Sequence, residues 1–246
     1  MTAPTFVVDA ALLPAGVQRV VISGPEGHHA ARVRRVEVGE LVQLVDGQGT
    51  VASAAVVRVE RDHVECAVRT LRTQDRPTPT LVVVQALPKG DRGELAVEML
   101  TEVGVDVVVP WAATHCVTQW RGERGARALA RWRTTAREAA KQSRRAWLPE
   151  VTELATTQEV ARRLAASAQG IVLHEGGEQR LADLAVPAEG DVVVIVGPEG
   201  GLTEEELATF AATGASVCRL GPSVLRTSTA GVVAAGILLA ASRWQR

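Results

Sequence analysis

The chain has little cysteine and no recognisable cysteine framework. Its 246 residues include three cysteines, Cys66, Cys116 and Cys218, an odd number without a C-x-x-C pair. This usage argues against a disulfide framework or a structural zinc site, and it favours a reducing compartment such as the cytoplasm. No other cluster has the spacing of metal ligands, and no Ser-His-Asp arrangement can be inferred from the sequence, so we expect no metal.

Long apolar runs are also missing. The longest, residues 230–241, has 12 residues, which is too short to cross a bilayer, and it predicts a buried helix. The N-terminus does not combine a basic start with an apolar core, so we expect no signal peptide and no membrane partner.

A strong overall charge is absent as well, but the local distribution is uneven. The formal net charge is −1, whereas residues 119–147 hold nine basic and two acidic side chains. A basic segment in a near-neutral chain is typical of a polyanion site, such as one for RNA. A solvated amphipathic helix with an arginine-rich outer face is the alternative. The basic residues are Arg121, Arg124, Arg127, Arg131, Arg133, Arg137, Lys141, Arg144 and Arg145.

The hydrophobic pattern changes along the chain and predicts two domains. Residues 1–73 contain short β-branched runs broken by turn sequences such as Asp46-Gly47-Gln48-Gly49, which favours a small β-barrel or sandwich. Residues 74–80 are polar and proline-rich and form the predicted linker. Residues 81–246 alternate strand-like and helix-like segments, which predicts an α/β domain with a parallel sheet covered on both faces.

Two glycine-bearing loops stand out in the C-terminal third. Residues 197–201 follow the run 192–196, and residues 220–226 follow the run 217–220. Loops at the ends of neighbouring strands are typical of an enzyme with a small-molecule site at one sheet edge. Neither loop is a G-x-G-x-x-G or phosphate-loop motif, which argues against ATP or a dinucleotide. For the first loop alone, a plain strand-to-helix turn is an equal alternative.

Three further polar positions are candidates for chemistry. Arg226 precedes a helix start, where the helix dipole disfavours a cation, so an anionic partner is a reasonable inference beside an ordinary surface arginine. His174 follows a strand and can exchange protons near neutral pH, although such histidines are more often structural. Lys89 and Arg92 lie between a strand and a helix and can meet phosphate. Trp120, Trp132 and Trp147 lie in the basic segment and either stack on bases or anchor the helix.

Several phrases in fixed order resemble one family. They are Lys89-Gly90-Asp91-Arg92, Thr101-Glu102-Val103-Gly104-Val105, Glu138 to Ser143 with Arg145 and Pro149, Leu173-His174-Glu175, Gly197 to Thr203, and Leu220 to Arg226. Together with the N-terminal phrases around His28-His29 and Asp46 to Gly49, they resemble the RsmE family of small-subunit ribosomal RNA uridine-N3 methyltransferases, in the SPOUT superfamily. Ser223 and Ser228 depart from the common pattern, in which arginine and glutamate are frequent.

The resemblance implies an α/β fold in which a SPOUT methyltransferase domain with a deep trefoil knot follows a PUA-like RNA-binding barrel. It implies S-adenosylmethionine as cofactor, a homodimer, and a uridine in the decoding region of 16S rRNA as substrate, on the small ribosomal subunit. Arg226 and Arg145 are the expected catalytic residues. The expected cofactor-binding residues are Leu173, His174, Glu175, Val196, Gly197, Pro198, Glu199, Gly200, Gly201, Leu220, Gly221 and Leu225. The expected RNA-binding residues are Lys89, Arg92, Arg131, Arg133, Arg137, Gln142, Arg34 and Arg35.

Two alternatives stay open from the sequence. A SPOUT ribose 2′-O-methyltransferase would have the same knot but a different product. A ribosome-assembly RNA-binding protein would keep the fold without turnover, although the intact glycine loops count against it.

Overall fold

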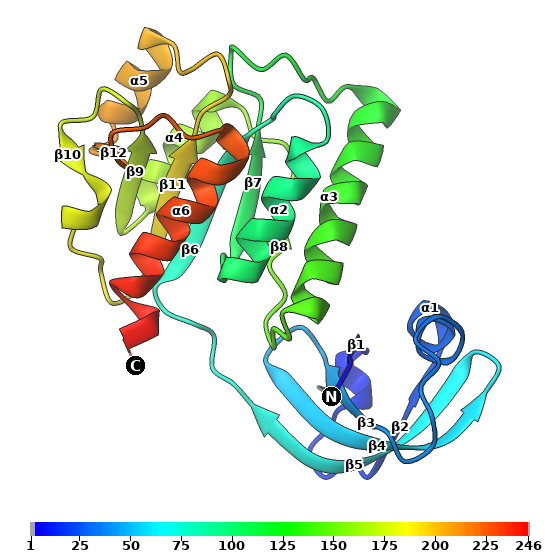
Figure 1. Cartoon of the computed structure of the whole chain (residues 1–246). Helices are drawn as coiled ribbons and strands as arrows, with labels where there is room; N and C mark the ends of the chain where they lie inside the picture. The colour runs from blue at the N-terminus through cyan, green and yellow to red at the C-terminus, as the bar shows by residue number, and fades with distance from the viewer. Residues whose placement is uncertain (1–2, 246) are drawn as a thin grey trace. The chain divides into compact units, whose positions relative to one another are not determined.

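The computed structural model describes residues 3–245, and these form two compact units (Figure 1). The first unit extends to Arg76 and also includes Ala140–Leu148; the second comprises Pro77–Ala139 and the chain from Pro149 onward. The sequence places 140–148 in the second domain, and the structure differs there. The segment joins the first unit because Ala146 packs with Val7, Val45 and Val51, and because the buried Lys141 Nζ lies 3.1 Å from a Glu26 carboxylate oxygen.

The first unit is a curled five-stranded sheet with the order β1-β3-β4-β5-β2. All of its strand pairs are antiparallel except β1 with β3. The predicted turn at Asp46 joins β3 to β4: the Asp46 carboxylate accepts hydrogen bonds from the backbone N–H groups of Gln48 and Thr50, at 2.7 and 2.9 Å. The strands are β1 (Thr5–Val7), β2 (Arg19–Ile22), β3 (Leu41–Val45), β4 (Thr50–Glu60) and β5 (His63–Thr73); two short helical turns, Gly24–His28 (α1) and His29–Val33, follow β2.

The second unit is built on a seven-stranded sheet with the order β10-β12-β9-β11-β6-β7-β8, and every strand pair in it is parallel. Parallel neighbours need crossover connections, and here helices supply most of them. The strands are β6 (Thr80–Ala86), β7 (Val107–Trp111), β8 (Glu150–Val151), β9 (Gln169–Leu173), β10 (Gln179–Arg180), β11 (Asp191–Val196) and β12 (Ser216–Arg219).

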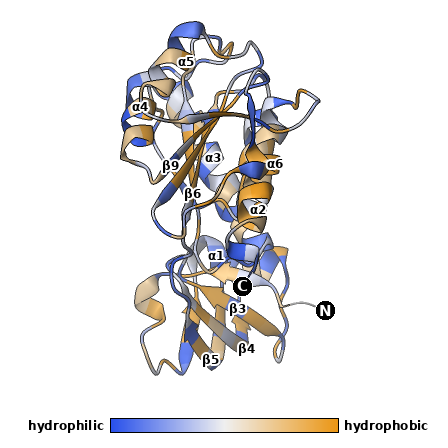
Figure 2. Ribbon diagram, turned by 90° about the vertical axis from the view of Figure 1, so that its left-hand side faces the viewer, coloured by the Kyte–Doolittle hydropathy of each residue, from blue (hydrophilic) through white to orange (hydrophobic). Residues whose placement is uncertain are grey.

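Helices cover both faces of this sheet, as the sequence predicts. Figure 2 shows α2 and α6 on one face and α4 and α5 on the other, and α3 lies beside α2, where Gly93 faces the Trp132 ring. The helices are α2 (Arg92–Val103), α3 (Gly122–Gln142), α4 (Thr157–Ala166), α5 (Glu204–Ala211) and α6 (Thr227–Ala240). None of the helices among residues 3–245 is long and apolar enough to cross a membrane.

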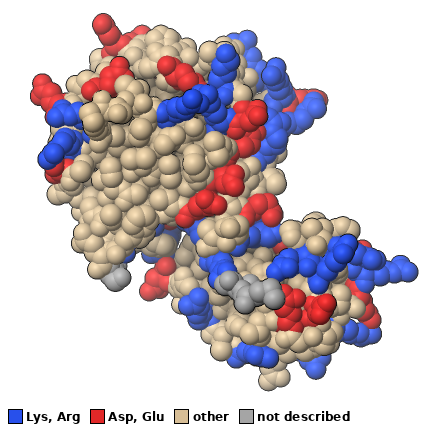
Figure 3. All heavy atoms as spheres, viewed as in Figure 1, with Lys and Arg blue, Asp and Glu red and all other residues tan. Residues whose placement is uncertain are grey.

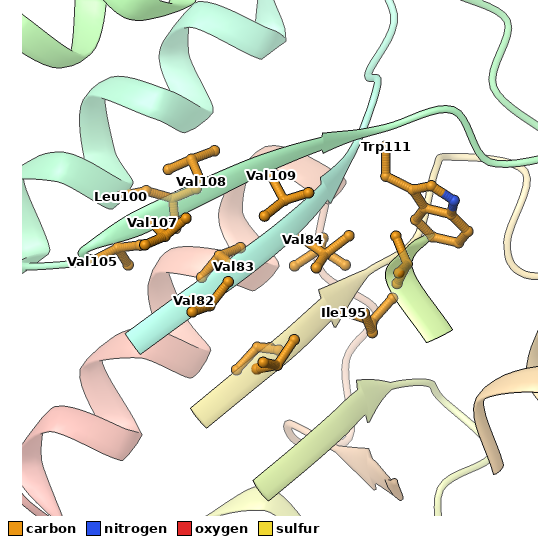
Figure 4. Close-up of a cluster of buried hydrophobic side chains, with 14 of the residues drawn as sticks. Val82, Val83, Val84, Leu100, Val105, Val107, Val108, Val109, Trp111 and Ile195 are labelled. Carbon is orange, nitrogen blue, oxygen red and sulfur yellow. The ribbon is translucent and has the colours of Figure 1, made fainter. Parts of the chain in front are cut away.

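The central strands are almost continuously apolar, because both of their faces are covered. Figure 4 shows valines of β6 and β7 with Ile195 of β11 in one cluster, which Leu100 of α2 also joins. At the end of β7 the Trp111 ring meets the Phe210 ring edge-on, with centroids 5.4 Å apart. Both rings are fully buried, and their contact packs the carboxyl end of β7 against α5.

Local signals account for several helix ends. A capping box of Thr203 and Glu206, which the sequence pattern Thr-Glu-Glu-Glu predicts, starts α5, and Gly104, with a φ of 112°, ends α2. The sequence predicts one helix over 126–145, whereas α3 starts at Gly122 and ends at Gln142. It ends there because Arg144 adopts a φ of 57° and the Arg145 N–H bonds back to the Ala140 carbonyl. Helix α4 was not predicted. The sequence predicts a last helix over 227–243, whereas α6 ends at Ala240.

Candidate functional site

One pocket of about 570 Å³ lies in the second unit, at the carboxyl ends of β9, β11 and β12. Its size is typical of small-molecule sites, and its position is the one that ligands favour in open parallel sheets. The structure brings every residue predicted to bind the cofactor into this one lining, together with Arg92, Leu202, Arg219, Pro222, Ser223, Val224, Arg226, Thr227 and Ala230.

The loop after β11, residues 197–201, approaches a neighbouring loop at the distance that only glycine allows. A Cβ on Gly200 would lie 2.9 Å from the Cβ of His115. The His115 Nδ1 lies 3.0 Å from the Gly200 carbonyl oxygen and 3.2 Å from that of Gly201. Carbonyl oxygens only accept hydrogen bonds, so Nδ1 carries the ring proton and donates to both. The loop after β7 therefore supports the loop after β11.

Glu206 reinforces the same junction from the first turn of α5. Its carboxylate is buried and accepts hydrogen bonds from the N–H and hydroxyl of Thr114, at 2.8 and 2.9 Å, and from the Thr203 N–H at 3.0 Å. Burial by itself raises the pKa of this carboxyl group, but these hydrogen bonds together outweigh burial and lower the pKa. Glu206 is therefore charged at neutral pH and ties two loops together.

The loop after β9, residues 174–178, is fixed by its own histidine and by Arg219 of β12. The Arg219 guanidinium donates to the carbonyls of Gly177 and Glu178, at 2.7 and 2.6 Å. The Gly176 N–H donates to His174 Nδ1 at 3.1 Å, so that nitrogen is unprotonated and its lone pair is occupied. The geometry thus gives His174 Nδ1 a structural role in the loop and leaves Nε2–H as a donor without a hydrogen-bond partner among the described residues.

The third loop, residues 220–226, leads into α6. Arg226 is the N-cap residue of α6, and its exposed side chain lines the pocket. Its guanidinium has no ion-pair partner among residues 3–245, so it is available to an anion. Ser223 is exposed in the lining, whereas Ser228 is buried in α6 and is not part of the lining.

The start of α6 is hydrogen-bonded to the first loop. The Thr227 hydroxyl donates to the Gly197 carbonyl at 2.7 Å and accepts from the Gln85 side-chain amide at 3.0 Å. Sequence reasoning missed Gln85, His115 and Arg219, because their roles depend on contacts between loops that are distant in sequence. A lone glutamine within the apolar run of β6 was the only available signal.

Intramolecular ion pairs occupy part of the predicted basic surface. Arg131 pairs with Glu94 at 3.0 Å and Arg133 with Glu153 at 2.7 Å. Figure 3 shows Lys and Arg side chains gathered over α3. Arg124 of α3 and Arg121, which directly precedes the helix, are exposed. Among the other predicted residues, Lys89 is exposed and Arg92 lines the pocket; Arg34, Arg35 and Gln142 are exposed in the first unit, and Arg145 is half-buried there.

The tryptophans of the segment are structural in this arrangement. Trp132 is buried and meets the Trp120 ring edge-on, with centroids 4.9 Å apart. Trp147 donates to the Gln74 carbonyl within the first unit at 3.0 Å. Of the two readings left open by the sequence, these contacts favour the one in which the rings anchor the fold.

Two family models match the chain along most of its length. An RNA methyltransferase domain matches residues 74–239, and an RNA methyltransferase PUA domain matches residues 22–69. The chain is 44% identical to the ribosomal RNA small subunit methyltransferase E of Mycobacterium tuberculosis, over 99% of this chain and 94% of the relative.

The chain belongs to the ribosomal RNA small subunit methyltransferase E family. The Bacillus subtilis member is 30% identical over 87% of this chain and 86% of its own length. A solved structure of the Neisseria gonorrhoeae methyltransferase E, bound to S-adenosyl methionine, matches with a TM-score of 0.86 and 27% identity over 97% of this chain and 98% of that one. The predicted fold class, a parallel-sheet SPOUT domain preceded by a PUA-like β domain, is confirmed.

Proposed function

We propose that this protein transfers a methyl group from S-adenosylmethionine to N3 of a uridine in the decoding region of 16S rRNA, on the small ribosomal subunit. The observation that carries the proposal is the pocket formed by the three predicted loops, in a chain 44% identical to a small-subunit rRNA methyltransferase over nearly its whole length. A location in the cytoplasm, where ribosomes are assembled, is part of the proposal.

The residues of the pocket fit S-adenosylmethionine, the cofactor of this family. A volume of about 570 Å³ suits a ligand of nucleoside size with an amino-acid tail. The loop glycines let backbone N–H and C=O groups come close to such a ligand, and an added Cβ at Gly200 would disturb the loop. We assign the cofactor to the three loops, through Leu173 to Glu175, Val196 to Gly201, and Leu220, Gly221 and Leu225. When bound, S-adenosylmethionine supplies the methyl group and leaves as S-adenosylhomocysteine.

The side chains of the pocket must deal with one proton. N3 of uridine is protonated at neutral pH, and its proton must pass to solvent water as the new N–C bond forms. A fixed cation beside the base lowers the pKa of N3 by favouring the anion. Arg226 meets this requirement, since its guanidinium lines the pocket and forms no ion pair with the described residues. Arg145 remains the second proposed catalytic residue. Ser228, which stands where relatives often have glutamate, is buried outside the lining, so a base at that position forms no part of the proposal.

The RNA has to reach the pocket with the target base unpaired or flipped out. We propose that Lys89 and Arg92 contact phosphates beside the pocket, and that α3, through Arg131, Arg133 and Arg137, contributes a broader basic surface. Gln142 and the exposed Arg34 and Arg35 of the PUA-like unit complete the proposed RNA contacts.

We also propose a homodimer. Figure 3 shows a broad area over α6 that has few charged side chains, and Val233 within α6 is 37% exposed. An outward apolar helix face of this kind favours a protein partner, and a second copy of the chain fits the family.

Nucleoside analysis tests the proposed reaction. Small subunits that lack ribosomal RNA methylation are incubated with the protein and labelled S-adenosylmethionine, and the RNA is digested to nucleosides. We expect the label in 3-methyluridine. Label in a 2′-O-methylated nucleoside would identify a ribose methyltransferase instead, and no labelled nucleoside would favour the assembly-factor alternative.

Arg226→Gln tests the proposed role of the cation. Removing one preorganised electrostatic group costs about 10²- to 10³-fold in kcat, and we expect a loss of this size with little change in cofactor affinity. The pH profile adds a second criterion: without the cation the N3 pKa stays higher, so the residual activity should rise more steeply with pH. An unchanged kcat and profile would remove Arg226 from the mechanism.

A further inference from the structure

A single polar side chain lies within the apolar run of the central strand β6. The strand reads Thr-Leu-Val-Val-Val-Gln-Ala, and Gln85 is completely buried. In the sheet it lies between Val196 of β11 and Pro110 of β7. Burying an amide among apolar side chains costs free energy unless all of its groups find partners. The presence of glutamine where leucine or methionine would fit the core therefore calls for a physical reason.

The hydrogen bonds of Gln85 have a defined direction. Its Nε2 donates to the Ala86 carbonyl at 3.1 Å and to Thr227 Oγ1 at 3.0 Å. A carbonyl only accepts, which fixes the orientation of the amide. The Thr227 hydroxyl has one proton and gives it to the Gly197 carbonyl at 2.7 Å, so it must accept from Gln85. A directional relay therefore runs from Gln85 through Thr227 to Gly197.

This relay joins two of the three pocket loops. Gly197 begins the loop after β11, and Thr227 follows Arg226 at the start of α6. Both residues line the pocket, whereas Gln85 does not. The buried strand thus fixes the direction of the Gly197 carbonyl and the position of the helix start beside Arg226, without touching a ligand itself.

One polar atom of the Gln85 side chain lacks a hydrogen-bond partner in the described part of the chain, so the relay does not satisfy the whole amide. The Gln85 Oε1 is buried and has no hydrogen-bond partner among residues 3–245. An orphan acceptor destabilises the folded state, and an apolar residue of the same shape would avoid that penalty. A position that gives up stability for one oriented donor is typical of a functional constraint.

We infer that Gln85 is a positioning residue of the methyl-transfer site, one that acts through Thr227 to hold the loops 197–201 and 220–226 in their binding geometry. The link to methyl transfer rests on the proposed function; the positioning of the loops does not.

Gln85→Met tests this role, since methionine keeps the length of the side chain and removes the donor. We expect an unfolding temperature equal to or above that of the wild type, and faster hydrogen exchange in backbone amides of 197–203 and 220–229. By analogy with residues that orient metal ligands, we expect calorimetric affinity for S-adenosylmethionine to fall about 10-fold or more. Thr227→Val should reproduce the faster exchange and the weaker binding, and Thr227→Ser, which keeps the hydroxyl, should bind far more tightly than Thr227→Val.

Gln169→Met is the matched control. Gln169 lies on β9 of the same sheet, also has a buried Oε1 without a partner among the described residues, and donates to the Ala185 carbonyl, which is not in the pocket. Its substitution should leave hydrogen exchange in the pocket loops and affinity for S-adenosylmethionine unchanged.

The inference would be overturned if Gln85→Met showed the hydrogen exchange and the cofactor affinity of the wild type. If the wild type yields no 3-methyluridine but Gln85→Met still speeds hydrogen exchange in the pocket loops, the positioning role is upheld and the proposed reaction is wrong.

Discussion

At Gly200, the pocket has no room for a side chain. Its Cα faces the His115 Cβ so closely that an added Cβ would lie at 2.9 Å. For Gly200→Val we expect the loop to shift, because the close neighbour is a Cβ and not a flexible side-chain end. Overpacking of this kind costs about 1–3 kcal/mol, so affinity for S-adenosylmethionine should fall about 5- to 150-fold by calorimetry.

The first, PUA-like unit provides the folding control for Gly200→Val, since hydrogen exchange in that unit should be unchanged.

Gly221 differs from Gly200, because a Cβ added at Gly221 meets no atom within 4 Å. Loss of binding in Gly221→Val would therefore come from filling the pocket and not from moving the loop. Normal cofactor affinity in both valine variants would contradict the assignment of the pocket.

Glu206 gives a pH dependence with a definite sign. Its pKa in the folded protein is lowered from the usual 4.5. Its contribution to stability is therefore complete above about pH 4.5 and is lost as the pH falls through the lower, folded-state pKa. Glu206→Gln cannot titrate, and at neutral pH it should be less stable by about 1–3 kcal/mol, the usual cost of leaving buried donors poorly paired.

Denaturant unfolding at a series of pH values measures this effect. The difference in unfolding free energy between the wild type and Glu206→Gln should stay level from pH 7 to 5 and shrink in more acidic buffer. A difference that grows on acidification would show that the carboxylate destabilises the junction of Thr114 and Thr203.

At the scale of single elements, the basic residues of α3 and of the residue before it differ in their availability to RNA. The arginines that the sequence predicts to bind RNA are partly held in ion pairs, whereas others are exposed. Arg131 and Arg133 form ion pairs within the unit, whereas Arg121 and Arg124 are exposed and lack such partners among the described residues. We expect replacement of Arg121 and Arg124 by Gln to flatten the salt dependence of RNA binding. The log–log slope should fall by about 0.7 for each phosphate that the variant no longer neutralises.

Titrations of rRNA fragments at several salt concentrations provide the slopes. The matched control is Arg162 and Arg163 on α4, which covers the opposite face of the sheet; their replacement by Gln makes the same change in charge and should leave the slope unaltered. Equal slopes for the α3 variant and the wild type would mean that this part of α3 is only a solvated surface.

The strands and helices that were predicted correctly have strong local signals. The valine runs of β6 and β11 identify buried parallel strands, and Thr203 with Glu206 marks the start of α5. Helix α4 was missed even though Thr156 and Glu159 form a capping box, because only Val160, Ala161 and Leu164 face the core. β8 and β10, with two residues each, leave no periodic pattern to detect.

The residues that line the pocket could be predicted from the sequence. The contacts that hold the pocket loops in place could not. Glycine phrases after apolar runs identify the lining residues, since strand ends in a parallel sheet lie at one edge. The contacts of His115 with Gly200 and of Gln85 with Thr227 join segments 85 and 142 residues apart. Such contacts arise from tertiary packing, which one sequence does not reveal. The same holds for the segment 140–148, which joins the first unit through Ala146.

At the scale of the whole molecule, the proposed homodimer makes a separate prediction. Sedimentation equilibrium should give twice the chain mass of 26.0 kDa. Val233→Glu puts a charge on the apolar face of α6 and should yield the monomer, because an unpaired charge is costly in a buried interface. Val57 of the first unit is the control, because it is exposed to a similar extent, 39% against 37% for Val233. Val57→Glu should leave the dimer intact. A monomeric wild type would contradict the proposal.

The most direct test of the central claim, that the three loops form the site of methyl transfer, is a crystal structure of the protein with S-adenosylmethionine. The cofactor should lie between residues 173–175, 196–201 and 220–226, with its methyl group open toward Arg226. Cofactor bound anywhere else, or a pocket that stays empty at saturating concentration, would contradict it.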